Sequence, residues 1–339
     1  MNEATPPEGS IDRRTFLILL GVVAASPSVS CGGRDPNDTS PETTGSVTAD
    51  AKRWFTADSF WNKALPDDAP QDPRSAEFLG WLDEHTNGFL LSGLGENRWG
   101  MPCFIAGESD PAWEVSLTNT APQVRPIMED GLRAPERALT ALTGTSDSPI
   151  VILDPARGVQ VALWQTSADA SGFQAVDAAI YWHDSNGLAA GDENPDGDPR
   201  NHGHRGIAPS TMLVQRPEIG QGIDHVLKVA IPGTAEWHVR PMVGHEPDRG
   251  GVIGQGMRLR IRADVDLEQH DLSEPALTIA RALQRYGAIV GDNSGADRIV
   301  LKVEQDLGQW SGVDLEADSL AAIPVDDLAF VRAGWEPQG

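Results

Sequence analysis

The chain has 339 residues, of which 40% are hydrophobic and 22% charged, and its formal net charge is −24. This length and composition predict a globular protein with enough apolar residues for a sizeable core in one large or two small domains. The strong negative charge excludes nucleic-acid binding as an expected role, because phosphate backbones are bound by broad basic surfaces.

The first 31 residues have the features of an export signal. Arg13 and Arg14 precede an apolar run that ends at Ala25 and is too short to span a bilayer. The stretch DRRTFL resembles the twin-arginine signal. The stretch SVSC resembles a bacterial lipobox, although its Ser28 stands where a large aliphatic residue is usual. These resemblances imply export, lipidation of Cys31 and a place in the cell envelope, or secretion if Cys31 is not lipidated.

Residues 32–51 are rich in Gly, Ser, Thr, Pro and Asp. They cannot bury much apolar area, so we expect a flexible tether that joins the lipid anchor to one folded domain at 52–339. The membrane is then a partner through the lipid anchor only. If Cys31 is lipidated, Cys103 is the one remaining cysteine and no internal disulfide can form. If the signal is cut elsewhere, Cys31 can pair with Cys103.

Strand patterns outnumber helix patterns in the folded domain. Apolar runs at 149–154 and 159–164 flank a Pro-Ala-Arg-Gly turn and predict a hairpin. Further strands are expected at 173–182, 225–232, 257–267 and 298–306. Apolar and charged residues alternate from Met257 onward, which predicts that Arg258, Arg260 and Arg262 lie on an exposed face.

Two segments have the periodicity of helices. One covers 75–86 with Ser75 as its N-cap, and the other covers 273–287, with Ser273 as N-cap and Gly287 as its stop. Strands and helices do not alternate regularly. We therefore expect a mainly β fold, an antiparallel β-sandwich or jelly roll with one or two packed helices.

Residues 191–206, GDENPDGDPRNHGHRG, concentrate polar groups in one short stretch. Its alternating oxygen-bearing residues are Asp192, Asn194, Asp196 and Asp198. This spacing is that of the start of a calcium-binding loop, although Gly203 stands where a bidentate glutamate belongs. The stretch is therefore either a calcium site completed from elsewhere or a solvated turn. His202 and His204 add a weak H-x-H pattern for zinc or copper.

The charge is unevenly distributed along the chain. Residues 200–262 carry nine basic and five acidic side chains, a net of +4, so the rest of the chain carries −28. Five of the eight histidines lie in the same segment. The basic residues either pair with acids brought near by the fold or bind an anionic group. Arginine suits the second role, because its planar fork binds a carboxylate at two points.

Two stretches, GIDHVLKVAIP (222–232) and ALQRYGAIVGDNSG (282–295), resemble motifs of uncharacterised exported bacterial β-rich proteins. Those motifs read G-x-I-x-H-A-L and A-L-x-x-Y-G-x-x-V-x-D-N, and the likeness covers roughly residues 204–295. This chain differs in having Val226 and Gly291 where alanine is usual. The matching positions of interest are His225, Tyr286, Asp292 and Asn293. The resemblance implies export and a shared architecture, and it supplies no reaction.

These observations favour a surface-anchored enzyme that cleaves a uronate-containing polysaccharide by β-elimination. Such a reaction needs a group that neutralises the uronate carboxylate, a base and an acid. The candidate catalytic residues are His225, His238, Tyr181, Tyr286, Arg205 and Asn293.

Two alternatives remain open. One is a glycoside hydrolase with paired carboxylates. Its candidate residues are Asp177, Asp224, Glu218 and Asp292. The other is a non-catalytic glycan-binding or envelope lipoprotein, for which a calcium-stiffened loop would serve equally well.

Overall fold

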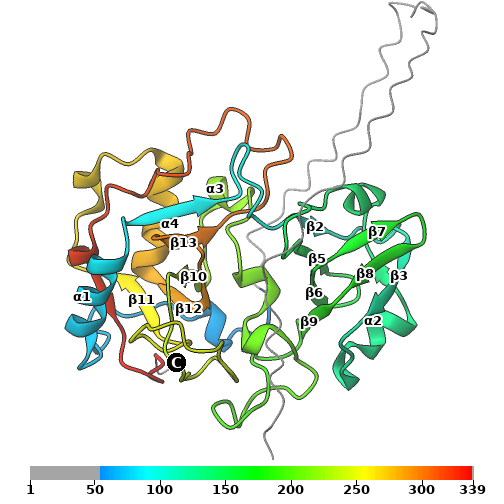
Figure 1. Ribbon diagram of the computed structural model, residues 1–339, viewed down its shortest axis with the longest axis horizontal. Helices are drawn as coiled ribbons and strands as arrows, with labels where there is room; N and C mark the ends of the chain where they lie inside the picture. The colour runs from blue at the N-terminus through cyan, green and yellow to red at the C-terminus, as the bar shows by residue number, and fades with distance from the viewer. Residues whose placement is uncertain (1–53, 338–339) are drawn as a thin grey trace, which may run out of the picture. The chain divides into compact units, whose positions relative to one another are not determined.

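A computed structural model describes residues 54–337. The predicted signal, the lipidation site Cys31 and the tether at 32–51 lie outside these residues. The described part contains 14 strands in three mixed sheets, together with four α-helices (Figure 1). The predicted mainly β fold with packed helices is thus confirmed, and no sheet closes into a barrel. Across residues 54–337, no helix has the length and hydropathy needed to cross a membrane.

The largest sheet has six strands, in the order β1-β13-β10-β12-β11-β14. Their bounds are β1 Phe89–Ser92, β10 Leu227–Ile231, β11 Arg258–Ile261, β12 Ala288–Asn293, β13 Ile299–Lys302 and β14 Leu328–Phe330. The pairs β1–β13 and β10–β12 are parallel, and the other pairs are antiparallel. We call this the large sheet.

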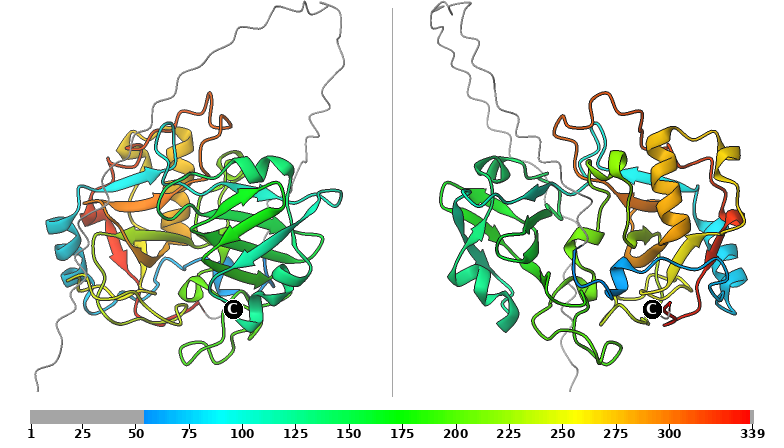
Figure 2. Two further views of the ribbon diagram at one scale, coloured as in Figure 1. Left: turned by 45° about the vertical axis from the view of Figure 1, so that its right-hand side comes forward. Right: turned by 180° about the vertical axis from the view of Figure 1, so that it is seen from behind.

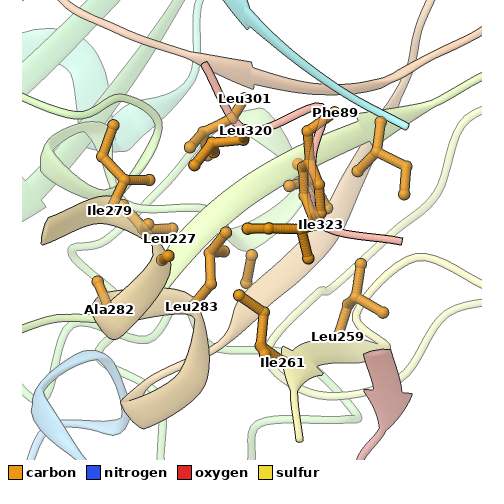
Figure 3. Packing of buried hydrophobic residues seen from close by; sticks show 14 of the residues in the cluster. Phe89, Leu227, Leu259, Ile261, Ile279, Ala282, Leu283, Leu301, Leu320 and Ile323 are labelled. Atoms are coloured by element: carbon orange, nitrogen blue, oxygen red, sulfur yellow. The ribbon is translucent and has the colours of Figure 1, made fainter. Parts of the chain in front are cut away.

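One face of the large sheet is covered by α4 (Glu274–Arg285). The helix α1 (Ser75–His85) contributes side chains to the same apolar core. In the reverse view of Figure 2, α4 lies in front of the strands. Ser273 caps α4 by accepting a hydrogen bond from Ala276 N–H, and Gly287, with φ +69°, follows its end, as predicted. Leu283 of α4 packs among aliphatic side chains from several strands (Figure 3). This face is an apolar core.

The other two sheets have four strands each and form a β-sandwich. The first has the order β2-β5-β6-β9 and the second β4-β3-β8-β7. Their bounds are β2 Cys103–Ile105, β3 Ala112–Leu117, β4 Leu132–Arg133, β5 Ile150–Asp154, β6 Val159–Trp164, β7 Ser167–Asp169, β8 Gly172–Ala175 and β9 Asp177–Trp182. The short helix α2 (Arg125–Glu129) packs on the second sheet through Ile127. The predicted hairpin is the antiparallel pair β5–β6.

The β5 strand is buried on both faces, which explains its continuous apolar run. Ile150 and Ile152 face the core between the two four-stranded sheets. Val151 and Leu153 face a separate core, which also contains residues of the segment 207–213 and of the large sheet. This separate core joins the sandwich to the face of the large sheet opposite α4.

Three local predictions were wrong. Ser75 is the first residue of α1 rather than its N-cap, and its hydroxyl accepts a hydrogen bond from Phe330 N–H instead. The segment 173–182 forms two strands, β8 and β9, in different sheets. Arg258 and Arg260 are buried, at 4% and 5% exposure, and the strand that carries them ends at Ile261.

The burial of these arginines has a clear physical cause. Arg258 donates to the backbone carbonyls of Tyr286 and Lys63, and Arg260 donates to those of Pro66 and Gln284. A chain segment almost 200 residues earlier therefore covers the face that alternation alone predicts to be exposed.

Candidate active site

The stretch Gly203–Gly206 has four consecutive residues with positive φ: 97°, 43°, 54° and 107°. For His204 and Arg205 this left-handed backbone costs roughly 1–2 kcal/mol each. The flanking glycines are required by space as well as by φ. A Cβ on Gly203 would lie 2.5 Å from Ala179 Cα, and one on Gly206 would lie 2.7 Å from the Pro241 carbonyl oxygen. Such strain in consecutive residues is typical of functional sites.

The strained turn directs His204 and Arg205 toward the face of the large sheet opposite α4. Lys228 of β10 donates from Nζ to His204 Nε2 at 2.8 Å and to Asp292 at 2.7 Å. The His204 ring stacks on Trp164, at the end of β6, with centroids 4.8 Å apart and planes 6° apart. Arg205 Nη2 lies 3.4 Å from the Asp292 carboxylate. Side chains from the sandwich, the turn and the large sheet thus meet at one point.

A bulge in β12 places Asp292 in this cluster. The register between β10 and β12 shifts so that Val229 pairs with Val290 and Ala230 pairs with Asp292, which leaves Gly291 as the extra residue. In a regular strand, residue 292 would share the face of Val290, toward α4. The bulge turns Asp292 to the face of Lys228 instead. Gly291 also leaves room for the lysine, because a Cβ there would lie 3.1 Å from Lys228 Cγ.

Two further polar side chains, Glu246 and Gln255, complete the cluster. Glu246 accepts a hydrogen bond from Asn293 N–H at 2.8 Å and is hydrogen-bonded to the Asp292 carboxyl. Gln255 accepts from Arg205 Nε at 3.2 Å. We call the group of Lys228, Asp292, His204, Arg205 and Glu246 the charged cluster. Its exposed fractions range from 6% for the Lys228 side chain to 28% for that of Arg205, so solvent reaches its outer part.

The environment lowers the pKa of His204 and raises the pKa of Glu246. Burial and the positive charge of Lys228 hold the pKa of His204 well below its ordinary value, so its imidazole is neutral near pH 7. Burial and the neighbouring Asp292 raise the pKa of Glu246. Burial alone would also raise the pKa of Asp292, but Lys228, His204 and Arg205 outweigh it, and the pKa of Asp292 lies well below its usual range. The cluster therefore holds a neutral base, a carboxyl that retains its proton to higher pH and an ionised carboxylate.

A second lysine extends the positive charge along the large sheet. Lys302 lies on β13, next to β10 in the sheet. Burial and the nearby Lys228 lower the pKa of Lys302. These two lysines and Arg205 outnumber the carboxylates Asp292 and Glu246. An anionic ligand is favoured at such a surface.

Of the predicted catalytic residues, Arg205 and Asn293 belong to this site. The Asn293 side-chain oxygen accepts hydrogen bonds from Thr234 N–H at 2.7 Å and from its hydroxyl at 3.0 Å. The Asn293 Nδ2 atom is buried and has no hydrogen-bond partner among residues 54–337. Tyr181 lies beside the turn, because its buried hydroxyl donates to the Gly203 carbonyl. Burial raises the pKa of Tyr181, so it stays protonated there.

The remaining predicted catalytic residues are His225, Tyr286 and His238, and each has another hydrogen-bond partner, which for His238 is His245. His225 binds the Glu218 carboxylate at 2.8 Å through Nε2 and the Val226 carbonyl through Nδ1. Glu218 lies in the short helix α3 (Glu218–Gln221). Tyr286 donates to Asp224 at 3.1 Å.

The candidates for a paired-carboxylate hydrolase are likewise dispersed among different partners. Asp177 accepts a hydrogen bond from Asn119, Glu218 and Asp224 belong to the two pairs just described, and Asp292 is held by Lys228.

In the predicted calcium loop, arginines pair with two of the carboxylates. Asp196 binds Arg240 at 2.9 Å, and Asp198 binds Arg200 at 2.6 Å. Asn194 is fully buried, and its amide donates to the carbonyls of Ala189 and Pro241. Asp192 is exposed, and His202 pairs with Ile180 through its backbone. Within residues 54–337, no three His, Cys, Asp or Glu side chains are placed to hold a metal together. Calcium binding stays a prediction.

Sequence reasoning missed Lys228, Glu246 and Lys302. The two lysines share a visible signal, because each stands in a Val-Leu-Lys-Val stretch, at 226–229 and 300–303. A lysine inside an apolar strand is expected to be buried and paired, and hence to be a candidate for function. Glu246 has no comparable signal, because it lies in an irregular segment.

Comparison with known proteins gives no match of the chain to a family model, a curated protein or a solved structure. The site is therefore interpreted from its own geometry.

Proposed function

We propose that the protein is an exported, envelope-anchored enzyme that cleaves a uronate-containing polysaccharide by β-elimination at the charged cluster. The observation that carries the proposal is the strained turn 203–206, which holds a neutral histidine and an arginine beside Lys228, Asp292 and Glu246. The export and anchoring parts rest on the twin-arginine-like and lipobox-like stretches before Cys31.

Arg205 is the group that binds the uronate carboxylate. Its Nε and Nη2 atoms are anchored by Gln255, the Gly291 carbonyl and Asp292. Within residues 54–337, no hydrogen bond holds Nη1. Binding a carboxylate there neutralises its charge and makes the neighbouring C5 proton more acidic. Lys228 and Lys302 increase the local positive potential.

His204 is the base and Glu246 the acid. The neutral imidazole takes the C5 proton through Nε2 when the substrate carboxylate draws the Lys228 ammonium away from it. The electron pair of the C5–H bond forms the C4–C5 double bond, and the bond from C4 to the glycosidic oxygen breaks. Glu246 donates a proton to that oxygen. Asp292 stays ionised and positions Lys228 and Arg205.

The paired-carboxylate hydrolase is the weaker alternative. Its two carboxyls flank the scissile bond at a separation of roughly 5–9.5 Å. Glu246 and Asp292 instead lie side by side, because both accept a hydrogen bond from Asn293 N–H. This contact supports a shared proton rather than an acid and a base on opposite sides of a sugar.

The experiment is a cleavage assay on the full chain with alginate, polygalacturonate and hyaluronan, and with a neutral glucan as control. Elimination is followed by the ultraviolet absorbance of the unsaturated uronate product, and any hydrolysis by new reducing ends. The variants are His204→Asn, Arg205→Lys and Glu246→Gln. Matched controls on exposed positions are His85→Asn, Arg281→Lys and Glu268→Gln.

We expect absorbance to rise on at least one acidic polymer, to be lost in the three site variants and to be kept in the three controls. Reducing ends without absorbance would move the assignment to a hydrolase. Binding of an acidic polymer without any cleavage would leave a glycan-binding lipoprotein. For the anchor, incorporation of a labelled fatty acid into the wild type but not into Cys31→Ser is expected.

A further inference from the structure

His238 and His245 form a pair that the proposed elimination does not use. Their Nδ1 atoms lie 2.8 Å apart, with ring centroids separated by 5.1 Å and planes inclined at 35°. Both residues are half-buried. They lie seven residues apart in an irregular segment, so the fold rather than a regular helix or strand brings the two nitrogens together.

Hydrogen bonds hold the backbone beside His238 and the side chain that follows His245. Around His238, Val239 N–H donates to the Gln255 carbonyl at 2.9 Å, and Gln255 N–H donates to the Trp237 carbonyl at 3.1 Å. Next to His245, the Glu246 side chain is held by Asn293 N–H. The two imidazoles are therefore presented with little freedom, and prior ordering of ligands lowers the entropy cost of binding an ion.

We propose that His238 and His245 form a copper(II) site through their two Nδ1 atoms. Metal–nitrogen bonds to histidine are about 2.0–2.1 Å long. Two such nitrogens at adjacent corners of a square plane are about 2.9 Å apart, whereas two corners of a tetrahedron are about 3.3 Å apart. The observed 2.8 Å fits the square-planar arrangement that copper(II) prefers and fits tetrahedral zinc less well.

The surroundings favour a cation at this pair. The carboxylate of Glu193 raises the pKa of His238, against the larger opposing effects of burial and of His245, so it lies close enough to act on a charge there. Within residues 54–337, no third His, Cys, Asp or Glu is already in place, so water completes the coordination. The inference is independent of the proposed elimination, because neither histidine belongs to the charged cluster.

The test is titration of the full chain with copper(II) chloride. Binding is followed by calorimetry and by quenching of tryptophan fluorescence, since Trp237 adjoins His238. Electron paramagnetic resonance then counts the coordinated nitrogens. The variants are His238→Gln and His245→Gln, with His85→Gln as the matched control and His202→Gln as a test of the H-x-H alternative. Circular dichroism checks that each variant is folded.

We expect one equivalent of copper(II) bound through two imidazole nitrogens, with a lower affinity for zinc chloride. Each variant of the pair should weaken binding by more than the roughly 10–100-fold expected for loss of a mere supporting group. The two other variants should bind like the wild type. Three results would overturn the proposal: no copper binding by the wild type, unchanged binding by folded His238→Gln and His245→Gln proteins, or loss of binding in His202→Gln.

Discussion

The two faces of the large sheet are made by the same strands and have opposite chemistry. On the α4 side, Leu227, Leu301 and Leu283 pack in an apolar core. On the other side, Lys228 and Lys302 directly follow Leu227 and Leu301 in sequence, and Lys228 contacts the Asp292 carboxylate and the His204 imidazole. Burial of apolar area explains the first face. Forming the charged face requires desolvation of charged groups and a strained backbone, and packing alone does not explain why the fold accepts these energetic costs.

The position of Asp292 shows how the two faces come to differ. Strand alternation would place it on the α4 side, and one extra residue in β12 moves it to the charged side. A protein under selection only for stability gains little from a buried ion pair, since apolar replacements are often as stable. We therefore infer that the α4 side carries stability and the charged side carries the proposed reaction, and four predictions test that division.

The largest expected effect is on activity. His204→Asn removes the base but keeps a residue that tolerates the left-handed backbone. Elimination should fall by about 10²–10⁴-fold. The free energy of unfolding should fall by about 1–3 kcal/mol, because the stacking on Trp164 and the hydrogen bond from Lys228 are lost. Steady-state rates and urea unfolding measure the two, and His85→Asn is the control. A larger loss of stability would show that the charged side also carries much of the stability of the protein.

The next effect is on stability from the other face. Leu283→Ala leaves a cavity beside Leu227 and Ile279 and should lower the free energy of unfolding by about 2–5 kcal/mol. The rate per folded molecule should stay unchanged, because no atom of Leu283 reaches the charged cluster. Arg281→Ala, on the exposed side of α4, is the control. A specific loss of rate in folded Leu283→Ala would show that the two faces are coupled.

The His225–Glu218 pair belongs to neither face. It tests whether a histidine contributes to stability without taking part in the proposed reaction. Burial would lower the pKa of His225, but Glu218 and the Val226 carbonyl outweigh it and raise that pKa above its ordinary value. The folded state then binds the proton more tightly than the unfolded state. The pair's stabilisation is fully present below pH 6.5, the ordinary value, and is lost as pH rises through the raised folded pKa.

Glu218→Gln should therefore destabilise the protein by about 1.5–3 kcal/mol in acid and by progressively less as pH rises. Unfolding by urea at a series of pH values measures this. A destabilisation of Glu218→Gln that grows as pH rises would contradict this prediction. Elimination by the folded variant should equal that of the wild type.

The smallest effect is a change in pH dependence. Lys228→Met removes the positive charge that contributes, after burial, to lowering the pKa of His204. The pKa of His204 should rise, and proton NMR of its imidazole measures the change. In the wild type, the rate should fall at lower pH as His204 is protonated and at higher pH as Glu246, whose pKa is raised, ionises. In the residual activity of Glu246→Gln the fall at higher pH should be absent, whereas an unchanged profile would remove Glu246 from the mechanism.

Features with local causes could be predicted from the sequence. The β5–β6 hairpin follows from two apolar runs around a turn, and α4 follows from Ser273, its periodicity and Gly287. The burial of Arg258 and Arg260 could not be predicted, because the covering carbonyls of Lys63 and Pro66 are almost 200 residues away.

The charged cluster was predictable only in part. Arg205 and Asn293 follow from the basic segment and the resembled motif, and the two Val-Leu-Lys-Val stretches indicate the lysines. No sequence pattern shows that Gly291 forms a bulge or that the turn 203–206 is left-handed. Those two backbone irregularities bring the cluster together, and tertiary packing sets both of them.

The most direct test of the division between the faces is to measure rate and stability on the same preparations of wild type, His204→Asn and Leu283→Ala. Elimination on the best acidic polymer and urea unfolding would be recorded for each protein. The account predicts that His204→Asn loses the rate and keeps most of its stability, while Leu283→Ala loses more stability and keeps its rate when folded. Retention of the rate by His204→Asn, or a loss of both properties in both variants, would contradict it.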